Sequence, residues 1–226
     1  MIWRDLSVAV RESARRKTMH IVVERDGSLA VQVPKGFSEE KILSVLEGRA
    51  YEVFRLLEKW KDAHRGAIRH DFFEGELFPL AGRNYPLRYV PGQSVPVVFA
   101  KNEFRLREGD ANPRESLKRF YRATGRDRIL KRLEFYAPRF VLSPKKVQIR
   151  DMRTRWGSCT PKGVITYNWR CVLTPVPVMD YLIVHELAHL EHHRHSREFW
   201  NHVAVILPRY EESVRWLQKN GVKTEL

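Results

Sequence analysis

The sequence contains 226 residues, of which 43% are hydrophobic and 30% are charged. This balance is that of a globular chain long enough for one large domain or two small ones. No apolar run reaches the roughly 18 residues that a membrane-spanning helix needs. Residues 1–17 contain no apolar stretch of the kind found in signal peptides. We therefore expect a cytoplasmic protein without membrane contact.

The chain is strongly basic, with a formal net charge of +14 that is spread over both halves of the sequence. Such a surplus favours polyanionic partners such as nucleic acid or nucleotides, although a solvated basic surface also accounts for it. The two cysteines, Cys159 and Cys171, are too few for a disulfide framework and too widely spaced for a Cys-x2-Cys zinc site. We expect both thiols to be reduced and buried.

The first half of the chain alternates between strand and helix patterns. Residues 20–33 alternate apolar and polar side chains around Asp26 and Gly27, which predicts a β-hairpin. Ser38 is a favourable N-cap for a long amphipathic helix over residues 39–64. Between residues 76 and 107, short β-rich segments are separated by glycine and proline, which predicts a group of strands.

A second long helix is predicted to begin at Pro113, because proline is favoured at the first helical position. Its apolar periodicity continues to about Tyr136, and Pro138 ends it. We expect an irregularity near Gly125, because glycine weakens a helix interior.

The last part of the chain mixes short strands with helices. Strands are predicted over residues 145–151 and 163–173, on either side of a turn-like Gly-Ser-Cys-Thr-Pro-Lys-Gly segment. A proline-containing connector follows at 174–177. The predicted helices are at about 178–193, 197–206 and 209–219, the last capped by Asn220-Gly221. The expected fold class is α+β: a β-rich N-terminal region with two long helices over 1–140, then a compact C-terminal domain over 141–226.

His185, Glu186 and His189 form a His-Glu-x-x-His motif inside the predicted helix 178–193. Residues four apart share one helix face, so both imidazoles can reach one metal ion. The glutamate beside the first histidine can hold a metal-activated water and take its proton. Apolar neighbours predict a largely buried helix, which a well-ordered site needs. The motif therefore predicts Zn²⁺ as cofactor and Glu186 as the catalytic base.

A catalytic zinc site requires a third protein ligand, and four residues downstream are candidates. These are His192, His193, His195 and Glu198. Eight residues of straight helix rise about 12 Å, so the third ligand must come from chain that has turned back. Residues 194–196 have the features of such a turn, because Ser196 is a good N-cap for the next helix. We predict His195 as the third ligand, with Glu198 as the alternative.

A second unusual cluster lies upstream, where residues 153–159 combine two arginines, a tryptophan and a glycine beside a predicted strand. The segment is either an edge strand with its turn, or a strand lining the cleft whose arginine contacts an anionic substrate or a developing oxyanion. Tyr167, Asn168 and Tyr210 are possible hydrogen-bond donors to a tetrahedral intermediate. The candidate substrate-binding residues are Arg153, Arg155, Trp156, Asn168 and Tyr210.

Several segments taken together match a known family pattern. They are RWGSC at 155–159, VITYN at 164–168, DYLIVHELAHL at 180–190, HS at 195–196, FW at 199–200, and Pro208 with Tyr210. In these segments the chain resembles the YgjP-like metal-dependent hydrolases, formerly a domain of unknown function grouped near the SprT-like and WLM zinc peptidases. The resemblance is dense over about 150–217, whereas the N-terminal part matches only in size and order. Position 194 is Arg where the family pattern has Asn.

The resemblance implies a zincin-like fold, in which an active-site helix lies below a small sheet whose edge strand follows the cleft. It implies His185, His189 and His195 as zinc ligands and Glu186 as general base, in agreement with the geometric argument. It does not define the substrate. Some members are described as peptidases, at least one is described as a nucleoside-triphosphate pyrophosphatase acting on UTP, and SprT-type relatives cleave proteins bound to DNA.

Three functions follow as alternatives. A zinc peptidase would use the edge strand near 164–168 to pair with an extended peptide. A UTP pyrophosphatase would hold phosphates with Arg153 and Arg155, but nucleotide hydrolysis commonly uses Mg²⁺ held by carboxylates, and a histidine-rich site favours zinc. A non-enzymatic, nucleic-acid-associated metal module would need a fourth protein ligand and would leave Glu186 without a role. We expect the peptidase.

Overall fold

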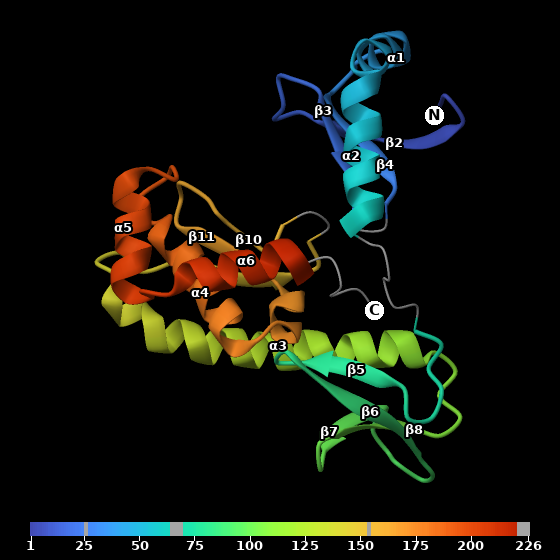
Figure 1. Cartoon of the computed structure of the whole chain (residues 1–226), viewed down its shortest axis with the longest axis vertical. Helices are drawn as coiled ribbons and strands as arrows, with labels where there is room; N and C mark the ends of the chain where they lie inside the picture. Colours follow the sequence, from blue (N-terminus) through green and yellow to red (C-terminus); the bar gives the residue numbers. More distant parts are fainter. Residues whose placement is uncertain (25–26, 64–69, 153–154, 221–226) are drawn as a thin grey trace. The chain divides into compact units, whose positions relative to one another are not determined.

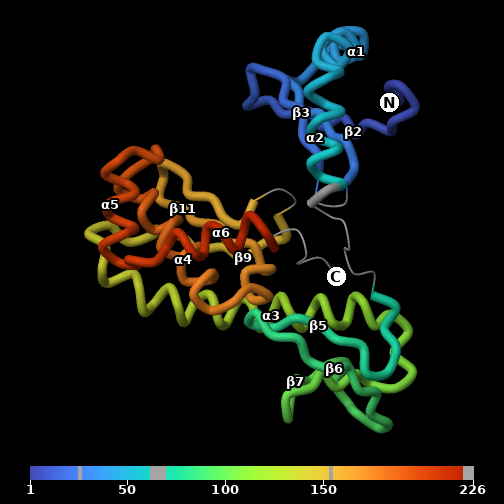
Figure 2. The backbone as a smooth tube through the Cα atoms, viewed as in Figure 1, coloured from blue at the N-terminus to red at the C-terminus, as the bar shows by residue number. Residues whose placement is uncertain are grey.

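The computed structural model describes residues 1–24, 27–63, 70–152 and 155–220. Contacts within the chain divide it into two compact units, essentially Met1–Ala67 and Ile68–Thr224 (Figures 1 and 2). The division that the sequence suggested near residue 140 falls inside the second unit. Within the described residues, no helix is both long and apolar enough to cross a membrane.

The first unit contains a mixed sheet, which in its described residues has the order β1-β2-β4-β3. Its strands are β1 (Ile2–Trp3), β2 (Leu6–Ser13), β3 (His20–Val23) and β4 (Leu29–Pro34). Antiparallel pairing of β3 with β4 confirms the predicted hairpin, although its turn residue Asp26 lies outside the described residues. Strand β2 was not predicted from the sequence, because Val8 is the one buried residue of its eight and its hydrophobic pattern is weak.

The predicted helix over 39–64 forms as two helices, α1 (Glu39–Gly48) and α2 (Ala50–Ala63), and His64 lies outside the described residues. Ser38 is confirmed as the N-cap, since its side chain accepts a hydrogen bond from the backbone N–H of Lys41. The break falls at Gly48 and Arg49, where glycine's low helix propensity lets the chain leave the helical conformation. Both helices contribute to the core of this unit through Ile42, Leu46 and Val53.

The second unit begins with a sheet of order β5-β6-β8-β7. Its strands are β5 (Leu77–Leu80), β6 (Arg83–Val90), β7 (Val97–Ala100) and β8 (Glu103–Arg107), which confirms the strands predicted between residues 76 and 107. The strands β6 and β8 are parallel, and the other pairs are antiparallel.

The long helix α3 (Pro113–Tyr136) joins two parts of the second unit. Its first half packs into the core of the β5–β8 sheet through Leu117 and Tyr121. Its second half packs into the core around the C-terminal helices through Ile129 and Leu133. Because one continuous helix lies in both cores, the β5–β8 sheet belongs to the same unit as the C-terminal residues.

The irregularity predicted near Gly125 is wrong, because α3 is continuous through this residue. A Cβ at Gly125 would lie 2.9 Å from the backbone oxygen of Trp169, in the 3₁₀ helix η2 (Trp169–Leu173). Glycine is needed here so that η2 can lie against α3, and surrounding contacts maintain the helix despite its low propensity.

A small sheet of order β10-β11-β9 covers the C-terminal helices. Its strands are β9 (Lys146–Arg150), β10 (Gly157–Cys159) and β11 (Val164–Asn168). The prediction of an edge strand at 164–168 is wrong, because β11 pairs with β10 on one side and β9 on the other. In the described part of this sheet, β10 is an edge. The strand predicted to reach residue 173 stops at Asn168, whose side chain accepts the N–H of Arg170 and begins η2.

Three helices complete the unit: α4 (Val176–Ala188), α5 (Arg197–Ile206) and α6 (Tyr210–Asn220). They agree with the three predicted helices, except that α4 begins at Val176, inside the predicted connector, and ends at Ala188, not near residue 193. Gly221, the predicted cap of α6, lies outside the described residues. The fold is therefore the mixed α+β class that the sequence predicted, with the His-Glu-x-x-His helix α4 next to β10.

Candidate metal centre

The helix α4 presents the motif from a buried position, as its apolar sequence predicted. Almost every residue from Val178 to Ala188 is buried, and the helix packs against α3, α5, α6 and β10. Asp180 anchors it to α3, accepting two hydrogen bonds from Arg132 and one from the Tyr136 hydroxyl. His185 lies on the open side of this helix, and His189 follows as its C-cap.

A tight reversal after α4 places the third histidine. The N–H groups of Glu191 and His192 both bond to the Ala188 carbonyl, which ends the helix in a turn. Ser196 then begins α5, with its side chain accepting the Phe199 N–H, so the predicted N-cap is confirmed. The intervening chain brings His195 Nε2 to 3.1 Å from His185 Nε2 and 3.2 Å from His189 Nε2.

Hydrogen bonds on the far ring nitrogens orient two of these imidazoles. The His189 Nδ1 lies 3.0 Å from the His192 carbonyl, so this nitrogen must carry the proton and Nε2 must carry the lone pair. The His185 Nδ1 lies 3.2 Å from the Tyr181 hydroxyl. Burial, with neighbouring His189 and His195 adding to it, lowers the pKa of His185 to about 3. Burial also lowers the pKa of His189. Both rings are therefore neutral near pH 7, as metal ligands must be.

The arrangement of the three rings fits one bound metal ion. Their ligand atoms all lie within 4.8 Å of one another. Nitrogens that share a tetrahedral zinc at 2.0–2.1 Å are about 3.3–3.4 Å apart, close to the two observed separations of 3.1 and 3.2 Å. Three facing Nε2 atoms cannot all be satisfied by protons of neutral imidazoles, whereas one cation satisfies all three lone pairs. The outer hydrogen bonds on His185 and His189 are the supporting contacts that ligand histidines normally have.

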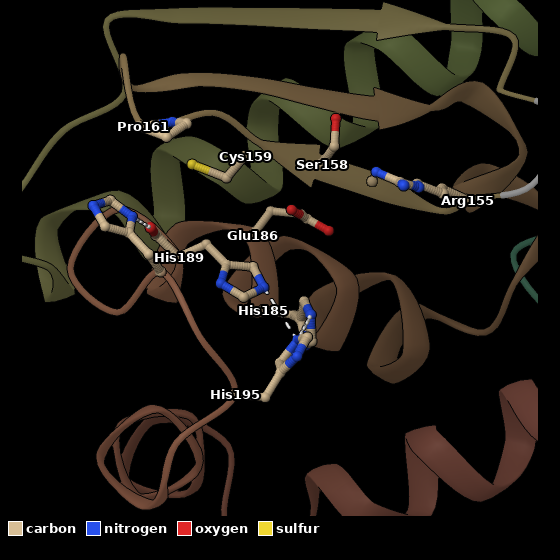
Figure 3. Close-up of a pocket in the computed structure, with 10 residues that line it drawn as sticks. Arg155, Ser158, Cys159, Pro161, His185, Glu186, His189 and His195 are labelled. Carbon is tan, nitrogen blue, oxygen red and sulfur yellow. Dashed lines mark hydrogen bonds between the residues drawn. The ribbon is translucent and has the colours of Figure 1, made fainter. Parts of the chain in front are cut away.

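Glu186 lies beside this triad on the β10 side of α4 (Figure 3). Its side chain is 6% exposed, and among the described residues its Oε2 is buried without a hydrogen-bond partner. Burial raises the pKa of Glu186 to about 8, although the positive charge of Arg155 opposes the shift. A buried carboxyl group with a free oxygen and a pKa near neutrality is suited to proton transfer.

Gly157 allows β10 to approach this carboxylate. A Cβ on Gly157 would lie 2.6 Å from both Cγ and Oε1 of Glu186, closer than real Cβ atoms come to other heavy atoms. The sequence singled out this glycine only as part of an unusual cluster. Its contact with Glu186 joins residues almost thirty positions apart, so no local pattern indicates it.

The triad and Glu186 border an open cleft of about 410 Å³. Residues just before β10, in β10 and in the turn after it form the opposite wall, and Figure 3 shows Arg155, Ser158, Cys159 and Pro161 there. Of these, the sequence selected Arg155 alone. Ser158, Cys159 and Pro161 were expected to form a turn, and their approach to α4 follows from the pairing of β10 with β11. Burial, with the nearby charge of Glu186, raises the pKa of Cys159 to about 11, so its thiol is protonated near pH 7.

Other predicted substrate-binding residues lie away from the cleft wall. Asn168 is fully buried, and its amide donates to the carbonyls of Met152 and Arg155, at 2.8 and 2.9 Å. Both amide protons of Asn168 thus bind backbone carbonyls of the segment before β10. Through the Arg155 carbonyl, Asn168 fixes the backbone position of Arg155. Arg153 lies outside the described residues.

Two aromatic residues that were predicted to bind substrate pack against other side chains and do not line the cleft. Trp156 is half-buried against the core around α4, and its carbonyl accepts the Asn168 N–H. Tyr210 stacks on Trp200, with ring centroids 5.5 Å apart, and Trp200 stacks in turn on His195 at 5.6 Å. Tyr210 therefore supports the ring of a candidate ligand through Trp200, and neither aromatic residue lines the cleft.

The residues that the sequence offered as alternative third ligands do not belong to the triad. Glu198 is exposed and does not join the triad; hydrogen bonds from Ser196 and from its own backbone lower its pKa. His193 lines the cleft, with Nδ1 3.2 Å from the His189 carbonyl. His192 points to a different group, which contains Glu191 and His202.

A histidine triad next to a buried carboxyl group in an open cleft is the arrangement of a metal-dependent hydrolase. The family model described as YgjP-like, metallopeptidase domain, matches residues 17–220, so the chain belongs to the YgjP-like family. At the level of the family this supports a metal-dependent peptidase with a peptide substrate. The comparisons give no support for nucleotide or nucleic-acid partners.

One solved structure is similar over part of the chain. It is the metallopeptidase zymogen of Pyrococcus abyssi abylysin, with 28% sequence identity and a TM-score of 0.37. The match covers 40% of this chain and 93% of that one. No match was found among functionally curated proteins.

Proposed function

We propose that this protein is a zinc-dependent peptidase, in which His185, His189 and His195 hold the ion and Glu186 is the general base. The observation that supports this most directly is the convergence of three imidazole nitrogens beside a buried carboxylate oxygen that has no partner within the described residues. The arrangement of α4 beneath the β9–β11 sheet supports a zincin-like catalytic part. Membership of a metallopeptidase family supports the reaction class.

The donor set favours zinc over other common divalent ions. Three neutral imidazoles with one open position are a known ligand set for catalytic Zn²⁺, whereas Mg²⁺ and Ca²⁺ prefer carboxylate and carbonyl oxygens. In such a site, bound zinc polarises the scissile carbonyl and lowers the pKa of a water molecule. Non-enzymatic metal binding would require a fourth protein ligand, and the described triad has three members.

Glu186 takes the proton of the attacking water in this proposal and passes it to the leaving amine. Its Oε2, which has no hydrogen-bond partner in the part of the chain that the structure describes, is available for this exchange, and a base of pKa near the working pH transfers protons most effectively. Arg155 lies on the cleft wall near Glu186, where its charge favours the ionised carboxylate. We assign Arg155 a second role, which is to contact an anionic group of the substrate or the oxyanion.

The peptide would lie along β10, because this strand is an edge of the described sheet and forms the cleft wall. An extended peptide can add to an exposed edge by backbone hydrogen bonds. Gly157, Ser158 and Cys159 would then pair with the substrate, in place of the residues 164–168 that the sequence suggested.

The proposal is tested by metal content and turnover together. The metal-free chain is incubated with Zn²⁺ and then with an unfolded protein substrate, with and without single-stranded DNA, and in a parallel reaction with UTP. Glu186→Gln should lose turnover by roughly two orders of magnitude or more while still binding zinc at the triad. Glu198→Gln, which changes an exposed carboxylate near the site, should retain both.

Peptide cleavage that depends on Glu186 would support the peptidase. Pyrophosphate release from UTP with the same dependence, without peptide cleavage, would replace it with the nucleotide hydrolase. If His189→Ala binds as much zinc at the triad as the unaltered chain, the proposed ligand set is incorrect.

A further inference from the structure

We propose a second divalent-cation site, formed by Glu191, His192 and His202, which is separate from the triad and holds the turn between α4 and α5. His192 Nε2 lies 3.3 Å from His202 Nδ1, and Glu191 Oε2 lies 3.7 Å from the same nitrogen. All three side chains are half-buried, and their ligand atoms lie within 4.8 Å of one another. None of them belongs to the first triad.

The separations fit a shared tetrahedral ion. Two nitrogens bound to zinc at 2.0–2.1 Å are about 3.3–3.4 Å apart, which agrees with the 3.3 Å between His192 and His202. The Glu191 carboxylate oxygen lies farther away, at 3.7 Å from His202 Nδ1, so a bound ion would have to draw this oxygen slightly inward. Two imidazoles with one carboxylate are a ligand set that favours Zn²⁺ over Mg²⁺ or Ca²⁺.

The two oxygens of Glu191 have different roles. Its Oε1 accepts hydrogen bonds from the N–H groups of Val141 and Leu142, at 2.8 and 3.3 Å. These bonds fix the carboxylate plane and leave Oε2 directed at His202. The His202 ring also lies against the Phe140 ring, with centroids 4.8 Å apart. A carboxylate oriented by backbone donors, facing a ring held by packing, has the outer support that metal ligands need.

An ion at this position would connect three segments that are distant in sequence. They are the chain after α3 at residues 140–142, the turn after α4, and the helix α5. The turn matters for the first site, because the backbone carbonyl of His192 accepts the Nδ1–H of the candidate ligand His189, at 3.0 Å. An ion that fixes the His192 side chain therefore also fixes the His192 carbonyl, which orients the His189 ring. The second ion thus stabilises the turn between α4 and α5.

Zinc stoichiometry tests this inference directly. The full-length chain is stripped of metal, titrated with Zn²⁺ at fixed pH, and its bound zinc is measured after dialysis. We expect about two zinc ions for the unaltered chain and about one for His202→Ala. His193→Ala is the matched control, because His193 is an exposed histidine on the same turn that belongs to neither group, and it should still bind two.

Glu191→Gln keeps an oxygen that can accept from Val141 and Leu142, and so preserves the fold while removing the charge. It should weaken the second zinc by more than the roughly 10–100-fold that loss of a supporting contact costs. A chain that binds a single zinc at saturation overturns the proposal. Two ions bound with unchanged affinity in His202→Ala or Glu191→Gln also overturn it, since the contacts would then be hydrogen bonds alone.

A stability measurement separates this site from the proposed catalytic one. In His189→Ala the triad keeps only two of its three ligands, so zinc whose effect then depends on His202 occupies the second group. Zinc should raise the melting temperature of His189→Ala by several degrees, and this rise should vanish in the double variant His189→Ala/His202→Ala. An equal rise of the melting temperature in both variants contradicts the second site. That result would not bear on whether the protein is a peptidase.

Discussion

Replacing Glu186 with glutamine should change how the stability of the metal-free chain depends on pH. The folded chain buries this carboxyl group to 6% exposure, and burial raises its pKa from an ordinary 4.5 to about 8, against the opposing charge of Arg155. Between these two values the folded chain holds a proton that the unfolded chain has released. The free energy of unfolding must therefore fall as the pH rises through this interval.

The size of the pKa shift of Glu186 determines how far the free energy of unfolding falls. One pKa unit corresponds to about 1.4 kcal/mol, so moving the pKa from 4.5 to 8 costs about 4–5 kcal/mol once the carboxyl group is ionised in both states. Integration from pH 5 to pH 8 gives a loss of about 3–4 kcal/mol. Glutamine does not titrate, so Glu186→Gln should lack this component. All other groups titrate in both chains and cancel in the difference.

The assay is urea unfolding in the presence of a chelator at several pH values from 5 to 8, followed by tryptophan fluorescence. The difference in unfolding free energy between the unaltered chain and Glu186→Gln should move by about 3–4 kcal/mol in favour of the variant as the pH rises. Glu198→Gln removes an exposed carboxylate and should follow the unaltered chain. Parallel stability curves for the unaltered chain and Glu186→Gln would refute the argument that burial controls this carboxyl group.

Three further substitutions test the surroundings of Glu186. Gly157→Ala places a methyl group 2.6 Å from the Glu186 side chain and should cost about 1–3 kcal/mol in urea unfolding, with reduced turnover, whereas Gly48→Ala meets nothing within 4 Å and should not destabilise. Asn168→Ala leaves two backbone carbonyls without their donors and should cost about 2–3 kcal/mol, while zinc content, measured after dialysis, stays unchanged. Arg155→Ala removes the cation that opposes burial, so the pKa of Glu186 should rise further and the stability–pH curve of the metal-free chain should extend to higher pH. An unshifted curve for Arg155→Ala would show that its charge does not reach the carboxylate.

Local patterns were sufficient to predict most helices and strands in this chain. Apolar periodicity and Pro113 located α3, and Ser38 and Ser196 located the starts of α1 and α5 through bonds to N–H groups three residues away. These features depend on contacts within a few residues. The same is true of the spacing that places His185 and His189 on one face of a helix.

Predictions that depended on long-range contacts were less accurate. The sequence suggested an irregular helix at Gly125, but the close approach of Trp169 makes this glycine a packing residue. It suggested an edge strand at 164–168, but pairing with β9 and β10 places β11 in the centre of its sheet. It suggested a domain boundary near 140, whereas α3 lies in the cores on both sides.

The sequence by itself determined the helix that presents the His-Glu-x-x-His motif, and it required the chain to turn back so that a third ligand could approach. The tertiary structure decided the rest of the site. It placed His195 against the other two imidazoles, set Gly157 in contact with Glu186, and made β10 the wall of the cleft. The physical reason is that helix periodicity and capping act between neighbours in the chain, whereas burial and the pKa of Glu186 depend on residues that only folding brings together.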